Sequence, residues 1–194
     1  MICCSQRYDF IEFTPHIFTL IHKHWFALKV FYNKVFEIEE ALMDEQIKSY
    51  IPCEEVKVVH NGLNKIVRKP VVNSLMFFRS TILEAVNIQE RFKNKVILYT
   101  RDKDGKKIPY IISDHEMNIF MLVSSSGEQG MEYFGADEPK FHWGEHVKVI
   151  GGKFKGAEGY ICRIGKNSRL VVAIEGVCAV VTSYIPKVFL EKII

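Results

Sequence analysis

The chain has 194 residues, 48% of them hydrophobic and 25% charged, so it can bury a core and is not a low-hydrophobicity disordered polymer. Lys and Arg number 26 and Asp and Glu number 23, and the resulting net charge of +3 excludes a polybasic protein of the histone kind. The five cysteines are scattered and form no C-x-x-C pair, which is typical of a reduced cytoplasmic compartment and gives no zinc framework.

Residues 1–23 predict an N-terminal extension of unknown role. Within them, residues 10–21 are the only stretch similar to a targeting signal, but Glu12, Pro15 and His16 interrupt it and no small-residue cleavage site follows. The stretch is also too short and too polar to span a bilayer. We therefore expect no membrane partner and a cytoplasmic location.

The next hundred residues, 24–123, predict an α+β domain. Residues 24–30 are rich in aromatic and aliphatic side chains, as in a strand, and residues 34–47 carry apolar side chains at helical spacing after a possible cap at Asn33. The Asn61-Gly62 pair between two β-type runs is a strong hairpin signal, since both turn positions need a positive φ. A two-stranded arm is expected there.

The rest of this half repeats strand and helix signals. We expect a buried strand at 71–79, a helix after Thr81, a hairpin over 96–112 and a helix after Ser113. Both helices begin with the side chains of a capping box, because Glu follows Thr81 and Ser113 by three residues. These elements predict an antiparallel sheet with flanking helices.

Beyond residue 123 the character of the chain changes. Residues 124–142 begin with a small, polar run without periodicity, so a flexible linker is predicted, with no regular element before about Trp143. Residues 143–194 contain short β-branched strands separated by glycine turns and no helical stripe. They predict a small SH3-like β-barrel, and their β-branched content favours strands.

Residues 144–159, GEHVKVIGGKFKGAEG, resemble the KOW motif, in which a strand enters a glycine-rich turn and a second strand leaves it. The apolar residues can feed one core, and the glycines allow turn geometries that a Cβ disfavours. The motif residues are Val147, Val149, Gly152, Phe154, Gly156 and Gly159. Ribosomal and other RNA-associated proteins also carry KOW motifs, so the preceding domain has to discriminate between them.

The preceding domain resembles the N-terminal domain of NusG-type transcription elongation factors. Residues 25–30, WFALKV, are similar to its first strand, the Asn61-Gly62 arm follows in the family's order, and residues 109–116, PYIISDHE, are similar to the start of its last helix. The two resemblances together span about residues 24–194. They imply a factor whose first domain docks on the clamp helices of RNA polymerase.

The resemblance assigns polymerase binding to an apolar surface. Its members here are Trp25, Phe26, Val72, Leu75 and Phe77. Where the family usually has an aromatic-Pro-Gly-Tyr or aromatic-Pro-Asn-Tyr turn, this chain has Val72-Asn73-Ser74-Leu75, which indicates a specialised paralog. Because neighbouring strand residues face opposite sides, Trp25 and Phe26 cannot share one patch if their strand is regular. Each residue alone can equally be sheet core.

Basic residues suggest a second contact. Lys29, Arg79, Arg91 and Lys93 can meet phosphates of non-template DNA or nascent RNA beside the polymerase. The near-neutral charge of the domain favours the simpler interpretation that they form a solvated face.

The sequence contains no P-loop, no G-x-G-x-x-G and no nucleophile elbow, so we expect neither catalysis nor a cofactor. His22 and His24 are a possible metal pair, but no third ligand is evident, so no metal site is expected. Two alternatives remain open: a ribosomal or other RNA-binding KOW protein, and an enzyme of an unrecognised kind.

The resemblance predicts a transcription elongation or antitermination factor that acts by binding. It implies specific target operons, such as surface-polysaccharide clusters, as found for specialised paralogs. It also implies that the KOW domain recruits a termination factor or a ribosomal protein.

Overall fold

The computed structural model describes residues 22–60, 63–136, 144–164 and 167–193. Most of the predicted N-terminal extension, residues 1–21, lies outside them, as do the predicted turn residues Asn61 and Gly62 and the position Trp143. In the described part, an antiparallel sheet of four strands has the order β2-β5-β1-β6. Its strands are β1 (His24–Val30), β2 (Lys48–Tyr50), β5 (Leu75–Ser80) and β6 (Val96–Leu98).

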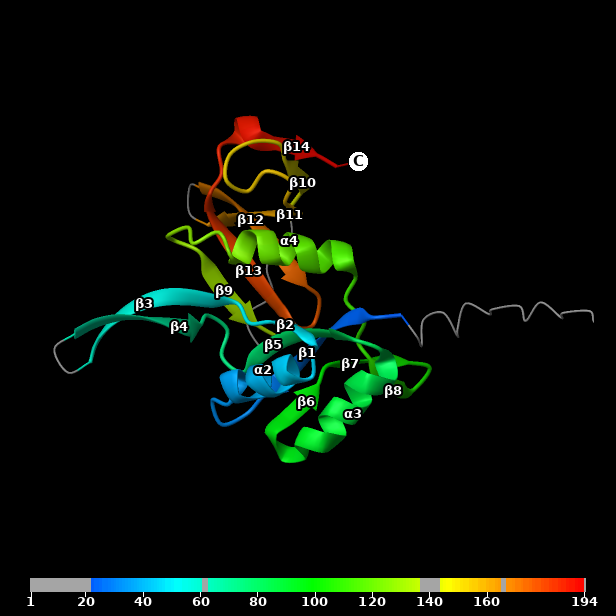
Figure 1. Cartoon of the computed structure of the whole chain (residues 1–194). Coiled ribbons are helices and arrows are strands. Elements are labelled where there is room, and N and C mark those ends of the chain that lie inside the picture. The colour runs from blue at the N-terminus through cyan, green and yellow to red at the C-terminus, as the bar shows by residue number, and fades with distance from the viewer. Residues whose placement is uncertain (1–21, 61–62, 137–143, 165–166, 194) are drawn as a thin grey trace, which may run out of the picture.

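Helices cover both faces of this N-terminal sheet (Figure 1). Helices α2 (Val35–Asp44) and α3 (Ile82–Phe92) pack on one face, where Phe26, Leu28 and Phe78 are fully buried. Helix α4 (Asp114–Ser124) packs on the other face. The alternation of β1 thus sends its successive side chains into two separate cores.

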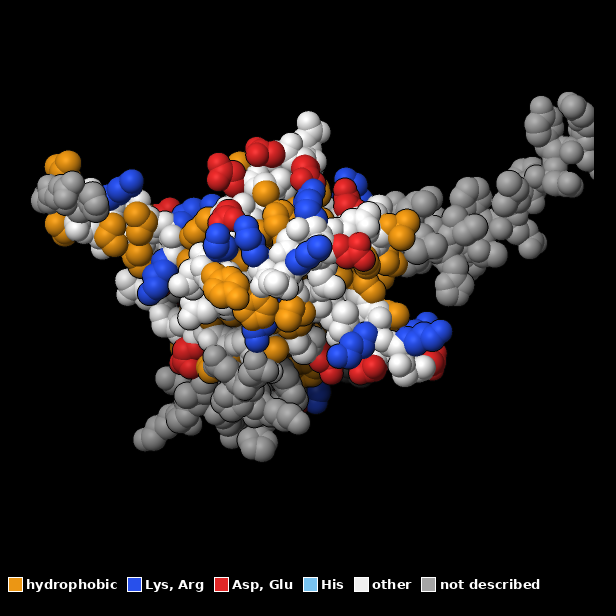
Figure 2. All heavy atoms as spheres, turned by 90° about the horizontal axis from the view of Figure 1, so that it is seen from below, with side chains coloured by type: hydrophobic (Ala, Val, Ile, Leu, Met, Phe, Trp, Pro, Cys, Tyr) orange, Lys and Arg blue, Asp and Glu red, His pale blue; other side chains and the backbone are white. Residues whose placement is uncertain are grey.

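Two hairpins leave the N-terminal sheet. The longer one, the arm, consists of β3 (Cys53–His60) and β4 (Leu63–Pro70) and extends far from the body (Figure 1). Apolar side chains are exposed along it, among them Val59 and Leu63. Hydrophobic side chains are visible along the arm at the left of Figure 2. The shorter hairpin pairs β7 (Thr100–Lys103) with β8 (Lys106–Pro109), after a single 3-10 turn η1 (Lys93–Lys95).

The C-terminal part of the chain is a second antiparallel sheet, with the order β14-β10-β11-β12-β13-β9 among the described residues. Its strands are β9 (Glu132–Gly135), β10 (His146–Val149), β11 (Glu158–Ile164), β12 (Asn167–Ile174), β13 (Cys178–Tyr184) and β14 (Leu190–Lys192), with the turn η2 (Lys187–Phe189) before the last. It lies across α4 from the N-terminal sheet, so α4 is the middle layer (Figure 1).

Most expected elements are confirmed, and three local predictions are wrong. The Asn33 side chain does not cap α2, because Tyr32 and Asn33 have φ values of 60° and 55° and form the tight turn that leads into the helix. The strand expected from residue 71 begins only at Leu75. The segment 124–142 is not free of regular structure, because Ser124 ends α4 and β9 pairs with β13.

Within the described residues, no helix has the length and apolar character needed to cross a membrane.

Glu37 should make the stability of the N-terminal layer pH-dependent. Its carboxylate accepts hydrogen bonds from Lys34 and Lys95, each at 2.8 Å, and these bonds lower the pKa of Glu37 from 4.5 to about 2. A group with a lowered native pKa stabilises the fold above its unfolded pKa and loses that contribution as pH falls through the native value. We expect Glu37→Gln to lower the urea midpoint at pH 7, with the difference from wild type shrinking between pH 4.5 and 2.

The matched control is Glu40→Gln, which changes an exposed glutamate on the same helix. A Glu37→Gln deficit that stays constant down to pH 2 would show that the loss is not due to the carboxylate charge.

Candidate protein-docking face

Four of the five residues predicted to bind polymerase gather on one face of the N-terminal sheet. Trp25, Leu75 and Phe77 come from β1 and β5, Val72 precedes β5, and all four belong to one apolar cluster. We call these four residues the docking face. Phe26 is not part of it, because it points to the opposite side of β1 and packs beneath α2 and α3. The prediction that included Phe26 in the same surface is therefore corrected.

Helix α4 lies directly on the docking face. The Phe120 ring centroid is 5.4 Å from that of Phe77, and the amide of Ile112, just before the helix, donates to the Trp25 carbonyl at 2.9 Å. The helix begins at the predicted capping box, in which the Glu116 amide donates to the Ser113 hydroxyl and the Ser113 amide donates to the Glu116 carboxylate. This cap fixes where the apolar side of α4 meets the sheet.

The docking face is covered in this structure. Trp25, Val72, Leu75 and Phe77 are 2%, 8%, 1% and 0% exposed. Their cluster continues through α4 to residues of the C-terminal sheet, including Val172 and Cys178. An exposed apolar patch was the condition for docking, and this condition is not met while α4 lies on the face.

Tyrosine hydroxyls close one end of the covered region. The hydroxyls of Tyr50 on β2 and Ser124 at the end of α4 are 2.7 Å apart, and Tyr133 of β9 donates to the Ser124 carbonyl at 3.2 Å. Burial raises the pKa of Tyr133 to about 12 and also raises that of Tyr50. Both phenols therefore remain protonated donors at neutral pH.

Polar contacts of Glu158 close the other end. His115 at the start of α4 lies 3.2 Å from the Glu158 carboxylate of β11, which also accepts from Lys148 of β10 at 2.8 Å. The Lys148 hydrogen bond, with a smaller effect of His115, lowers the pKa of Glu158. The carboxylate thus links α4 to two strands of the C-terminal sheet.

The predicted nucleic-acid residues do not form one cluster. Arg79 on β5 pairs with Asp114 at 2.9 Å, whereas Arg91 at the end of α3 pairs with Glu45, and Lys93 follows Arg91 on that other layer. Lys29 lies on β1, on the same side of the sheet as Trp25. On the face in Figure 2, basic and acidic side chains lie among one another. This arrangement favours a solvated surface over a continuous phosphate track.

The glycine-rich motif shapes the C-terminal sheet. Val147, Val149 and Phe154 are buried in the shared core, and Gly156 has a φ of +94° in the turn between β10 and β11. At Gly159 a Cβ would lie 2.3 Å from the Val171 carbonyl oxygen of the neighbouring strand. Only glycine fits at this position without moving the backbone.

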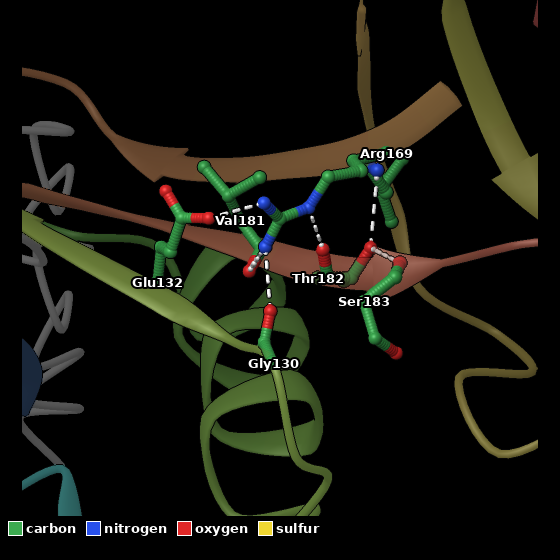
Figure 3. Close-up of polar contacts among 7 residues, drawn as sticks. Gly130, Glu132, Arg169, Val181, Thr182 and Ser183 are labelled. Carbon is green, nitrogen blue, oxygen red and sulfur yellow. Dashed lines mark hydrogen bonds and ion pairs between the residues drawn. The ribbon is translucent and has the colours of Figure 1, made fainter. Parts of the chain in front are cut away.

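Sequence reasoning missed the strand β9 and its anchor Arg169. The guanidinium of Arg169 crosses β13, donates to the carbonyls of Thr182 and Gly130, and forms an ion pair with Glu132 (Figure 3). The sequence signal for β9 is weak, because only the short run Glu132-Tyr133-Phe134 indicates a strand there. Arg169 itself was assigned only to a strand, although it is just 8% exposed.

The four side chains of the docking face are apolar, so this face can bind a partner by burying apolar area. The described residues contain no group of three His, Cys, Asp or Glu side chains placed to hold a metal ion.

A family comparison finds a match over the part of the chain that forms this layer. The model of the family described as "Transcription termination factor nusG" matches residues 23–121, which span the N-terminal sheet and most of α4. The chain belongs to the NusG family. Members of this family are transcription factors that bind RNA polymerase and are not enzymes. This assignment makes the chain a transcription elongation or antitermination factor in the broad sense.

A similar solved structure, described as "Domain interaction in Thermotoga maritima NusG", is 18% identical, with a TM-score of 0.42. The match covers 88% of this chain and 97% of that one. No curated protein matches the chain.

Gly159→Ala should destabilise the C-terminal sheet of this NusG-family protein. The added methyl would overlap the Val171 carbonyl, so β11 and β12 have to separate, at a cost of about 2 kcal/mol or more in the free energy of unfolding. Gly135→Ala is the control, since a Cβ there meets no atom within 4 Å. Urea unfolding followed by circular dichroism measures both, and equal midpoints would contradict the close-approach argument.

Proposed function

We propose that this protein promotes processive transcription by binding RNA polymerase through the docking face. The observation that carries the proposal is the convergence of Trp25, Val72, Leu75 and Phe77 on one side of β1 and β5. The family match over the same layer supports it. An apolar face of this kind suits the tip of a polymerase clamp helix, because burial of apolar area anchors a partner without specific charges.

Docking requires a second arrangement of the chain. The face is covered by α4 and, beyond it, by the C-terminal sheet, so a polymerase helix and the C-terminal sheet compete for the same region. In this proposal the C-terminal sheet moves away from α4, and α4 shifts on β1 and β5, before or during docking. Polymerase then stabilises the open form through its preference for that form.

The effect on transcription follows from linkage. A factor that binds the closed, processive polymerase more tightly than the paused one shifts the balance toward the former. Pausing and termination decrease without a covalent step. The proposal includes specific target operons, such as surface-polysaccharide clusters. This part of the proposal rests on the atypical Val72-Asn73-Ser74-Leu75 segment.

We further propose that residues 143–194 are an SH3-like KOW barrel and that residues 24–123 form a separate polymerase-binding domain. The glycine-rich turn between β10 and β11 and the antiparallel order of the C-terminal strands support this division. Once released, the barrel offers a surface to a termination factor or a ribosomal protein. Non-template DNA or nascent RNA remains a proposed contact of Lys29 and Arg79.

The test compares two leucines buried on opposite faces of the same sheet. Leu75→Ala and Leu28→Ala remove the same atoms from sites that are 1% and 0% exposed, and each should cost about 2 to 5 kcal/mol in the free energy of unfolding. Only Leu75 belongs to the docking face. We expect Leu75→Ala to weaken binding to a reconstituted elongation complex about tenfold more than Leu28→Ala, which corresponds to about 1.4 kcal/mol.

Affinities are measured with the full-length chain at a temperature where both variants remain folded. Equal losses in the two variants would contradict the assignment of docking to this face. Tight binding of structured ribosomal RNA without binding to polymerase would favour the RNA-binding alternative.

A further inference from the structure

We propose that Lys48 and Arg79 form a cationic rim at one end of the docking face, and that this rim selects a polymerase helix with an acidic side chain beside its apolar stripe. The inference rests on the proposed function, because it specifies the chemistry of the partner that the docking face binds. It gives Arg79 an acidic protein partner in place of a nucleic-acid contact.

The charged side chains that the four strands of the N-terminal sheet place on the docking side are all positive. Lys48 lies directly opposite Arg79, and Arg79 directly opposite Trp25, so these residues form one row across β2, β5 and β1. Strand alternation adds Lys29, which lies opposite Leu75 at the other end of the face. The four strands contain no Asp or Glu. A partner that packs on this side therefore meets only positive charge from the strands.

The ammonium of Lys48 is directed onto the docking face. Its Nζ lies 5.4 Å from the centroid of the Trp25 ring, so the side chain reaches from the edge strand β2 across β5. Lys48 is exposed and forms no ion pair with the residues that the structure describes. A helix that packs on Trp25 has to accommodate this ammonium, and an acidic side chain on that helix complements it.

The guanidinium of Arg79 is only partly satisfied. Its Nη2 donates to Oδ2 of Asp114 at 2.9 Å, whereas its Nε is buried and has no hydrogen-bond partner among the described residues. Nε and Nη2 share one edge of the guanidinium, and such an edge can bind both oxygens of a carboxylate. Asp114 thus occupies half of a site that an acidic side chain of a partner can fill completely.

One carboxylate faces two cations at the rim. Asp114 begins α4, and the other acidic residue of the first turn, Glu116, is engaged by the amide and the hydroxyl of Ser113. Like charges directly opposite each other on neighbouring strands repel, so Lys48 and Arg79 favour a second anion between them. The adjoining apolar residues favour an acidic protein helix over a phosphate backbone as the source of that anion. In this structure α4 itself is a helix that brings a carboxylate to the rim.

The test removes or reverses the rim charges in the full-length chain and measures binding to a reconstituted elongation complex. We expect Lys48→Gln and Arg79→Gln each to raise Kd about three- to fivefold at about 50 mM salt, and Lys48→Glu to raise it about tenfold. These differences should largely disappear at about 0.5 M salt, because ions screen the contacts of exposed charges.

Two control variants make the same changes away from the rim. Arg91→Gln matches Arg79→Gln, since Arg91 pairs with Glu45 and is 44% exposed while Arg79 is 39% exposed. Lys187→Gln matches Lys48→Gln, because Lys187 is exposed on the C-terminal sheet. Both controls should keep the wild-type Kd and its salt dependence.

Charge exchange locates the partner's acidic residue. Each Asp or Glu of the polymerase clamp helices is changed to Lys in turn and combined with Lys48→Glu. We expect one of these combinations to restore the affinity that Lys48→Glu loses, since the exchange recreates the ion pair in the opposite sense.

The outcomes separate the rim from the proposed function. If wild type binds polymerase and the rim variants lose no more affinity than the controls, the rim is overturned and the proposed function stands. If wild type does not bind, both fail. If the rim variants instead lose affinity for single-stranded DNA in the absence of polymerase, the two cations contact nucleic acid and the acidic-helix assignment is wrong.

Discussion

The whole arrangement depends on α4 being apolar on more than one side. Met117, Ile119, Phe120 and Val123 are all buried, and at about 100° per residue they occupy an arc of about 160°, which is a wide apolar face for one helix. The helix therefore needs an apolar partner on each side, and the two sheets supply them. The same helix that covers the docking face also attracts the C-terminal sheet, so the hiding of the face follows from the sequence of α4.

Polar groups at the two ends of α4 fix the orientation of the two sheets relative to each other. Tyr50, Ser124 and Tyr133 exchange hydrogen bonds at one end, and His115 with Glu158 does so at the other. Each of these groups can be solvated by water when the layers separate, so the polar contacts orient the sheets with a modest net contribution to their affinity. Contacts between domains in one chain are commonly of this moderately polar kind.

Local sequence signals predicted the elements well, because each depends on residues close together. The Ser113 capping box, the arm and β1 are of this type. The grouping of Trp25, Val72, Leu75 and Phe77 came from a family resemblance combined with strand alternation. The covering of that face by α4, and of α4 by the C-terminal sheet, depends on contacts between distant segments, for which no local pattern exists. The pairing of Glu132 with Arg169 was missed for the same reason, as 36 residues separate them along the chain.

The pairing of β9 also sets the length of the tether between the two sheets. While β9 is paired, the seven residues 125–131 join α4 to the C-terminal sheet and span at most about 24 Å. While β9 stays paired, the C-terminal sheet cannot move further than this from the end of α4, so any larger separation of the two layers has to break the ladder between β9 and β13.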